Sequence, residues 1–357
     1  MADLFSPRTL AHGPALKNRF MLAPLTNLQS HPDGVLSDDE FKWLTLRAKG
    51  GFGLTMTCAA HVQAVGQGFP GQLGVFGAQH LAGLTRLAAE IKRHGSVAAL
   101  QMHHAGNRSP KDLVGTPVSA SDDPETGARG LSLGEVEQLV EDFVAAAVRA
   151  EQAGFDGVEI HGAHGYVLAQ FLSPEINKRA DRYGGSIENR ARIFHEIIDG
   201  VRARTRPDFQ VGLRLSPERF GLKLAEIVET TRTILADGKI DYLDMSLWDV
   251  FKEPVEDEFK GRSLMSYFTD LDRGQVRLGV AGKVTSPAIA AQMLENGADY
   301  VLIGRAPRSR GAVSPRARDA AFTPVALPVT AEYLANEGLG PAFVKYMSTW
   351  PGFVEAA

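Results

Sequence analysis

Two histidines and a tyrosine lie within six residues near the middle of the chain. Residues 158–166 read V-E-I-H-G-A-H-G-Y, so a short apolar run ends at Ile160 and is followed by His161, His164 and Tyr166. We expect these three side chains to lie where a strand gives way to a loop. Two imidazoles can hold one oxygen atom as it gains negative charge, and a nearby phenol can deliver a proton. This combination suits the reduction of an activated carbonyl compound.

The composition limits the class of protein. Of 357 residues, 44% are apolar, which is enough for a substantial core, and the formal net charge is −4. Nothing in that charge indicates nucleic acid or an anionic membrane as a partner. The single cysteine, Cys58, excludes an internal disulfide and any four-cysteine zinc or iron–sulfur site. The N-terminus lacks a signal-peptide apolar region, and there is no run of about 18 apolar residues, so we expect a cytosolic protein without a membrane span.

Eight short apolar runs recur along the chain, and most are followed by a longer amphipathic segment. Runs rich in Val, Ile and Leu without strict alternation are typical of parallel strands covered by helices. The predicted strands are Arg19–Ala23, Phe52–Thr57, Val97–Gln101, Gly157–Ile160, Gln210–Leu215, Tyr242–Ser246, Val276–Val280 and Tyr300–Ile303. Eight strand–helix units favour an α/β fold of the (β/α)8 TIM-barrel type. A Rossmann fold is disfavoured, because the first strand is not followed by a G-x-G-x-x-G motif. We predict one domain over residues 1–357, with the barrel at about 18–310 and a tail at 311–357.

Two helices carry clear start and stop signals. Residues 132–135 form a capping box that opens a helix running to Ala153, and Gly154 suits the left-handed residue that follows a helix. Residues 286–287 give a serine N-cap with proline at the first helical position, and Gly297 ends that helix.

In a barrel of this kind the chemistry sits at the C-terminal ends of the strands. The last two strands lead to A-G-K and I-G-R, which contain Gly282, Lys283, Gly304 and Arg305. Barrels often bind a phosphate with these two loops, because glycines let backbone N–H groups approach the anion and cations add positive charge. The alternative is a pair of ordinary glycine turns, each with a surface cation beside it.

Other strand ends indicate what lies above the phosphate. A flat ring with imide-like edges would need an amide side chain that both donates and accepts, such as Gln101. Arg214 would favour negative charge on that ring when it is reduced, although an arginine at a strand end is often a paired structural charge. Ala59 and Ala60 leave room for a planar system close to the backbone. With the phosphate loops, these residues favour flavin mononucleotide (FMN) across the barrel mouth.

These motifs together resemble the Old Yellow Enzyme family of FMN-dependent ene reductases. The resemblance spans nearly the whole chain, from N-R-F-M-L-A-P-L-T (18–26) to V-L-I-G-R (301–305). Its most specific stretch is residues 159–190, where H-x-A-H-G-Y, F-L-S-P, N-x-R, D-x-Y-G-G-S and E-N-R occur together and in order.

The resemblance implies a role for each matching residue. Residues implied to lie against the flavin ring are Pro24, Leu25, Thr26, Ala60, Gln101 and Arg214. Residues implied to hold its phosphate are Gly282, Lys283, Gly304 and Arg305. His161 and His164 are implied to bind the electron-withdrawing oxygen of the substrate, and Tyr166 to donate the proton.

The same resemblance implies the reaction. Reduced flavin would pass a hydride to the β-carbon of an α,β-unsaturated ketone, aldehyde, imide or nitroalkene, and NADPH or NADH would reload the flavin in the same pocket. One branch of the family has a cysteine where Thr26 stands and a tyrosine where Leu28 stands. Thr26 matches the other branch, so no argument about flavin potential rests on a thiol here.

Several alternatives stay open. The tail residues Tyr346, Trp350 and Phe353 could reach a neighbouring subunit's site in a homo-oligomer, or they could pack on their own barrel. Residues 104–131 form a long insertion after the third strand, of a kind that often acts as a lid.

Other kinds of site are less favoured. Zinc bound by the histidines is disfavoured because the expected Arg214 and Arg305 would oppose a cation, and no carboxylate is clearly placed beside them. Cys58 is expected to be a small buried residue, since no base or charged partner is evident next to it. A related FMN barrel with different chemistry would carry a cysteine cluster, and a non-catalytic FMN-binding barrel would need no proton donor.

Overall fold

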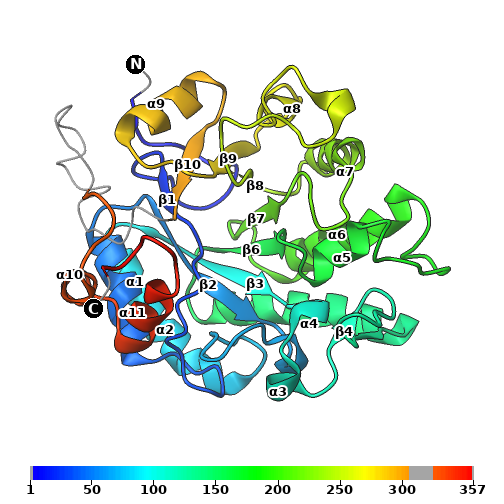
Figure 1. Ribbon diagram of the computed structural model, residues 1–357, viewed down its shortest axis with the longest axis horizontal. Coiled ribbons are helices and arrows are strands. Elements are labelled where there is room, and N and C mark those ends of the chain that lie inside the picture. The colour runs from blue at the N-terminus through cyan, green and yellow to red at the C-terminus, as the bar shows by residue number, and fades with distance from the viewer. Residues whose placement is uncertain (1–2, 305–324, 356–357) are drawn as a thin grey trace.

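Eight parallel strands form a closed barrel, with helices around its outside (Figure 1). The structure is a computed structural model that describes residues 3–304 and 325–355. The strand order around the barrel is β1-β10-β9-β8-β7-β6-β3-β2, which confirms the predicted (β/α)8 fold. The barrel strands are β1 Phe20–Leu22, β2 Leu54–His61, β3 Val97–His103, β6 Gly157–Gly162, β7 Gln210–Leu215, β8 Tyr242–Ser246, β9 Arg277–Ala281 and β10 Tyr300–Ile303.

The two helices with predicted capping residues begin and end as expected. The helices are α1 Asp38–Lys49, α2 Leu81–Arg93, α3 Lys111–Val114, α4 Leu133–Gln152, α5 Val167–Leu172, α6 Ile187–Arg204, α7 Leu224–Asp237, α8 Ser266–Thr269, α9 Pro287–Glu295, α10 Ala331–Asn336 and α11 Pro341–Ser348. The capping box at Ser132 is present at the start of α4, and Gly154 after its end has a φ of +88°. Ser286 caps α9 as predicted, and Gly297 beyond that helix has a φ of +100°. None of the helices within residues 3–304 and 325–355 is long and apolar enough to cross a membrane.

Three predicted strands match in full, and β2, β3 and β6 run two or more residues further towards the site than predicted. β2, β3 and β6 continue because their last residues still pair with neighbouring strands: His61 pairs with His103, and His161 with Arg214. His161 therefore lies within a strand rather than in the loop after it. A strand position fixes the direction of this imidazole more firmly than a loop would.

The barrel interior is apolar at one end and polar at the other. Its apolar part includes Met21, Leu54, Tyr242 and Tyr300, and the N-terminal segment contributes Leu10 and Leu16 to the same cluster. Towards the C-terminal ends of the strands, charged groups replace these side chains. Chemistry in this fold is thereby confined to the C-terminal mouth.

The C-terminal tail packs on the barrel of its own chain. Figure 1 shows α10 and α11, in orange and red, beside the blue helix α1. The rings of Trp43 and Phe343 meet edge to face at 5.3 Å between centroids. Arg47 donates to the Glu337 carbonyl at 2.9 Å, and Phe353 is buried in the main core. Of the two alternatives for the tail, its described residues follow the one in which the tail packs on the barrel of its own chain.

The insertion after β3 contains short ordered elements. The 3-10 helix η3 Gly106–Arg108 is followed by α3 and by a two-stranded sheet of β4 Val118–Ser119 and β5 Arg129–Gly130. The buried side chain of Gln170 in α5 ties η3 to the barrel, since its amide donates to Asn107 Oδ1 at 2.6 Å. A lid function for this insertion stays a prediction. The other 3-10 helices are η1 Ala64–Gly66, η2 Ala78–His80 and η4 Asp257–Phe259.

Candidate active site

Two adjoining cavities open at the C-terminal end of the barrel, with volumes of about 180 and 210 Å³. They share the lining residues Pro24, Leu25, His164, Arg214 and Trp350. The first cavity also contains Thr26, Gln101, His161 and Tyr166, and the second also contains Gly282, Lys283 and Gly304. The fold thus gathers the predicted site residues from both halves of the chain. The two exceptions are Ala60, whose side chain faces elsewhere, and Arg305, which lies outside the described residues.

The two histidines form a connected pair. His161 Nε2 lies 3.3 Å from His164 Nδ1, and His164 Nε2 lies 2.6 Å from the Ser246 hydroxyl. Burial lowers the pKa of both imidazoles well below the ordinary value, and the neighbouring cations Arg214 and Arg108 lower them further. Both rings are therefore neutral at pH 7, and each has one N–H to donate.

Backbone geometry places His164 over the cavity. Its φ of +60° and the φ of +71° at Gly165 make two successive left-handed residues. The turn is held by a 3.0 Å hydrogen bond from the His164 N–H to the Ser216 hydroxyl. A side chain at Gly165 would meet the Phe220 ring at 2.7 Å, so this position requires glycine.

Tyr166 lies beside the pair at the N-cap of α5. Its ring centroid is 5.3 Å from that of His161 and 4.4 Å from that of His103. Its hydroxyl has no hydrogen-bond partner within the described part of the chain, and it lines the first cavity. Burial raises the pKa of the phenol, although Arg108 acts in the opposite direction. The group is a protonated donor at neutral pH.

A layer of buried charged and polar groups lies at the base of the first cavity. Gln101 donates to Glu159 at 2.7 Å, and Arg214 lies 3.1 Å from Asp244. Burial raises the pKa of both carboxyl groups, Glu159 and Asp244. Gln101 and Arg214 are 1% and 5% exposed as whole residues, so their side chains are held in fixed positions below the mouth.

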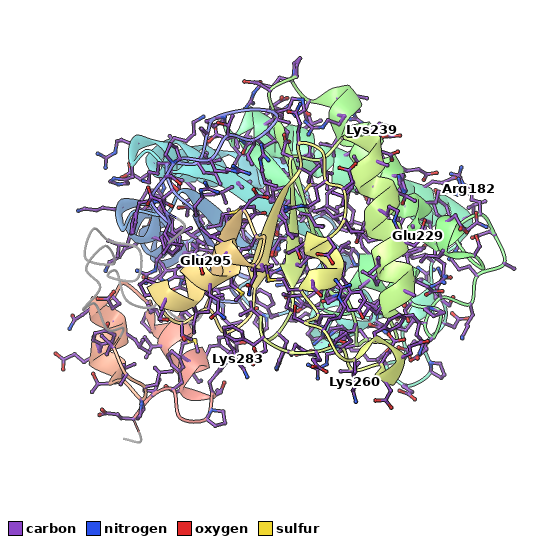
Figure 2. The ribbon with its side chains drawn as sticks, turned by 90° about the horizontal axis from the view of Figure 1, so that it is seen from above. Arg182, Glu229, Lys239, Lys260, Lys283 and Glu295 are labelled. Carbon is purple, nitrogen blue, oxygen red and sulfur yellow. The ribbon has the colours of Figure 1, made fainter. Side chains whose placement is uncertain are left out.

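The second cavity contains Gly282, Lys283 and Gly304, which were predicted to hold a phosphate. A Cβ on Gly282 would lie 2.8 Å from the Asp249 backbone nitrogen, so only glycine fits this turn. Lys283 follows with a φ of +53°, and its ammonium group pairs with Asp249 at 2.9 Å. Figure 2 shows Lys283 on the side of the barrel that carries α10 and α11. The lysine charge is thus shared with a carboxylate, a feature that the sequence did not indicate.

Ala60 departs from the expected inward position. A β-bulge shifts the register of β2 between Met56 and Ala59, which interrupts the alternation of side chains along the strand. Ala59 consequently lines the cavity, while the Ala60 side chain packs in the main core. Any contact between Ala60 and a ligand would have to come from its backbone.

Several lining residues were not assigned to the site from the sequence. They are Phe69, Ser246, Trp248, Phe343, Tyr346, Met347 and Trp350. The aromatic residues of the tail were the available signal for the last group. For Phe69, which follows β2 in an irregular segment, the sequence carries no comparable signal.

The surroundings of Cys58 differ from the expectation that no charged partner lies beside it. The thiol is buried as expected, but the carboxyl group of Glu40 lies next to it. Burial and this acidic neighbour raise the pKa of the thiol well above its ordinary value. The residue is therefore an unreactive thiol. No group of three or more His, Cys, Asp or Glu side chains within residues 3–304 and 325–355 is arranged to hold a metal ion.

The barrel, the neutral imidazole pair and the adjoining anion cavity define a barrel oxidoreductase that binds a phosphorylated planar cofactor. Residues 3–307 match the model of the NADH:flavin oxidoreductase / NADH oxidase family. The chain belongs to this family. Its cofactor is accordingly FMN, and its reductant is a reduced nicotinamide nucleotide.

Individual relatives agree with this assignment. The chain is 36% identical over 313 residues to a probable NADH-dependent flavin oxidoreductase, YqiG, of Bacillus subtilis, covering 85% of this chain and 84% of that one. The old yellow enzyme homologue from Zymomonas mobilis superposes with a TM-score of 0.80 at 25% identity, covering 96% and 99% of the two chains. Morphinone reductase in complex with tetrahydroNAD gives 0.76 at 28% identity, covering 93% and 94%.

The residues present fit FMN. Gly304 leaves space beside its backbone at the expected phosphate end, because a Cβ added there would meet no atom closer than 3.5 Å, and Gly282 and Lys283 line the same cavity. Pro24 and Leu25 line both cavities and so join the phosphate end to the ring end. Gln101 and Arg214 supply amide and guanidinium groups there. This separation of an anion cradle from a polar ring pocket matches a ring with a phosphorylated tail.

Proposed function

We propose that this protein reduces the C=C bond of α,β-unsaturated carbonyl or nitro compounds. The observation that carries the proposal is the Tyr166 hydroxyl, which has no partner among residues 3–304 and 325–355, beside the linked His161 and His164 in one cavity. When bound and reduced by NAD(P)H, FMN would supply a hydride to the β-carbon of such an alkene. The remaining tasks, which are to hold the substrate oxygen and to protonate the α-carbon, belong to these side chains.

The histidine pair binds the carbonyl or nitro oxygen. Because both imidazoles are neutral, each carries one N–H, and the long 3.3 Å contact between the two rings gives way when an N–H turns to the oxygen on which negative charge grows. One such donor can contribute roughly 3 kcal/mol to transition-state stabilisation. His164 is held by Ser246 and His161 lies in β6, so little reorganisation is needed when charge develops.

Tyr166 donates the proton to the α-carbon. Its raised pKa keeps the phenol protonated at pH 7, and its hydroxyl is not committed to another described residue. The guanidinium group of Arg108 lies 4.8 Å from the ring centroid and stabilises the phenolate that forms after transfer. Solvent can then restore the proton through the open mouth of the cavity.

The Tyr166→Phe variant tests this assignment, because it removes the proton donor and keeps the ring. We expect alkene reduction to slow by about 10²-fold or more, while flavin reduction by NAD(P)H stays within about twofold. Stopped-flow absorbance of the flavin measures the two half-reactions separately. Tyr267→Phe, which loses a hydroxyl outside the cavity, is the matched control.

Two outcomes would contradict the proposal. Equal loss in both half-reactions of Tyr166→Phe would remove the proton-donor role. Wild-type protein that is reduced by NAD(P)H but passes no electrons to cyclohexenone, maleimide or nitroalkenes would indicate a related FMN barrel with different substrate chemistry.

A further inference from the structure

Two arginines lie next to the two cavities, and each covers the aromatic ring of a lining residue, Tyr166 of the first cavity and Trp248 of the second. Arg108, in η3, has its Cζ 4.8 Å from the Tyr166 ring centroid and 5.9 Å from that of Phe220. Arg219, in the loop after β7, has its Cζ 4.9 Å from the centroid of Trp248. Phe220 directly follows Arg219, so the two guanidinium groups belong to one continuous rim.

The charges of these two arginines are not compensated by carboxylates within residues 3–304 and 325–355. Arg214 is matched by Asp244, and Lys283 by Asp249, but Arg108 and Arg219 form no ion pair with a described residue. Both are exposed. The described rim therefore carries two positive charges that remain available to a ligand.

The rim is held in a fixed shape. Arg219 and Phe220 both adopt left-handed backbone conformations, with φ of +70° and +54°. Such residues cost energy and persist where their surroundings determine them. Ser173 donates to the Gly221 carbonyl at 2.9 Å, which ties this loop to the end of α5. On the other side, Arg108 donates to the His164 carbonyl, so the insertion contacts the oxygen-binding turn directly.

We propose that Arg108 and Arg219 form an anion-binding rim that selects activated alkenes bearing a carboxylate group. This inference rests on the proposed function, because it names the class of alkene that the same cavity takes. A ligand whose oxygen is held by His161 and His164 lies next to Tyr166, and Arg108 covers the ring of that tyrosine. A carboxylate on the far side of the ligand would meet a guanidinium group, which binds it with two parallel N–H donors.

The phosphates of NAD(P)H offer the same chemistry, so the experiment must separate the two sources. We expect the substrate carboxylate to be the anion, because Arg108 is anchored on the residues that handle the substrate itself. The probes are 4-hydroxybenzoate and p-cresol, which present the same phenol oxygen to the histidine pair and differ in the carboxylate. Their dissociation constants are measured by isothermal titration calorimetry on the oxidised holoprotein.

In Arg219→Ala we expect 4-hydroxybenzoate to bind about tenfold more weakly, with p-cresol unchanged within about twofold. In Arg108→Ala, which also loses the contact with the His164 carbonyl, we expect the ratio of the two dissociation constants to change by about tenfold. Arg108→Lys should recover part of the loss, since it keeps the charge. Raising the salt concentration should reduce the difference between the dissociation constants of the two ligands in the wild type but not in the alanine variants. Arg262→Ala is the control, because Arg262 also lies over a tyrosine, at 4.4 Å from the Tyr267 centroid, but pairs with Asp270 away from the site.

The rim assignment is overturned if both phenols weaken equally, if neither changes, or if only the apparent affinity for NADH or NADPH falls in stopped-flow flavin reduction. A wild type that binds neither phenol would instead remove the oxygen-binding pair, and with it the proposed function. The two failures are therefore distinguishable.

Discussion

At the scale of single residues, the site depends on hydrogen bonds that fix neutral imidazoles. His164 has one nitrogen towards His161 and the other towards Ser246, so both sides of the ring are engaged. Ser246 ends β8, and its hydroxyl also lies 3.4 Å from an Arg214 amino group. The serine thus connects His164, which we propose binds the substrate oxygen, with the cation expected near the flavin.

Replacing Ser246 with alanine should loosen the orientation of His164. We expect phenol to bind the oxidised holoprotein about three- to tenfold more weakly, which corresponds to one lost hydrogen bond. Titration of the flavin absorbance with phenol measures this change. Ser246→Thr keeps the hydroxyl and should bind phenol nearly as the wild type does, whereas unaltered affinity in the alanine variant would show that Ser246 does not orient the ring.

At the scale of elements, the loop between β9 and α9 is specified by one close backbone contact. A side chain at Gly282 would lie 2.8 Å from the Asp249 nitrogen and 2.9 Å from the Trp248 carbonyl carbon. The backbone cannot yield there without moving the loop after β8. The same contact positions Lys283 and Asp249 for their ion pair.

Gly282→Ala should therefore displace the phosphate end of the cofactor site. We expect FMN to bind about tenfold more weakly, because overpacking of this kind costs about 1–3 kcal/mol. Reconstitution of apoprotein with FMN, followed by flavin fluorescence, gives the dissociation constant. Gly134→Ala lies in α4 with open space around the added methyl group and should leave that constant unchanged; a similar loss in both variants would exclude a local effect.

The tail is a second element whose docking matters for the site. Phe343 is 1% exposed and packs against Trp43, while Tyr346, Met347 and Trp350 on and just after the same helix line the cavity. We expect Phe343→Ala to cost about 3–5 kcal/mol of local docking energy and to release α11 from α1. Limited proteolysis should then cut near residues 325–355 faster than in the wild type. An unchanged digestion pattern would mean that other contacts hold the tail.

At the scale of the whole molecule, buried ionisable groups link stability to pH in opposing directions. Burial lowers the pKa of His104 to about 3 and that of His103, His161 and His164 well below 6.5. Burial raises the pKa of Glu159 and Asp244. The contribution of these histidines to the free energy of unfolding falls as pH drops below about 6.5, because only the unfolded chain then binds protons at these positions. The contribution of the two carboxyl groups to the free energy of unfolding falls as pH rises above their pKa values in the unfolded chain, because the unfolded chain then releases these protons more readily than the folded protein does.

A variant at one histidine isolates its share of this dependence. His104 is buried beside Gly66 and is not among the cavity residues. We expect His104→Gln to reduce the difference in unfolding free energy between pH 7.5 and pH 5.0 by about 2 kcal/mol relative to the wild type. Urea unfolding of both holoproteins at the two pH values measures it. If the unfolding free energy changes equally between the two pH values in both proteins, His104 takes up its proton in the folded state near its ordinary pKa.

Local patterns in the sequence determined the barrel and much of the site. Apolar runs and capping residues placed the strands and helices, since these depend on side chains near in sequence. The segment 158–166 and the two glycine turns could be proposed as the catalytic and phosphate ends because each is a contiguous motif, and the structure places their described residues in two adjoining cavities. The resemblance to a known family then supplied the cofactor, and the family match confirmed it.

Contacts between distant residues were decided only by the tertiary structure. The bulge in β2 depends on pairing with β3, and it placed Ala59 rather than Ala60 in the cavity. The pairing of Lys283 with Asp249 joins two loops, and the tail reaches the site by packing on a helix about 300 positions earlier in the chain. No local pattern encodes such partners, because their energy comes from surfaces that meet only after the barrel has closed.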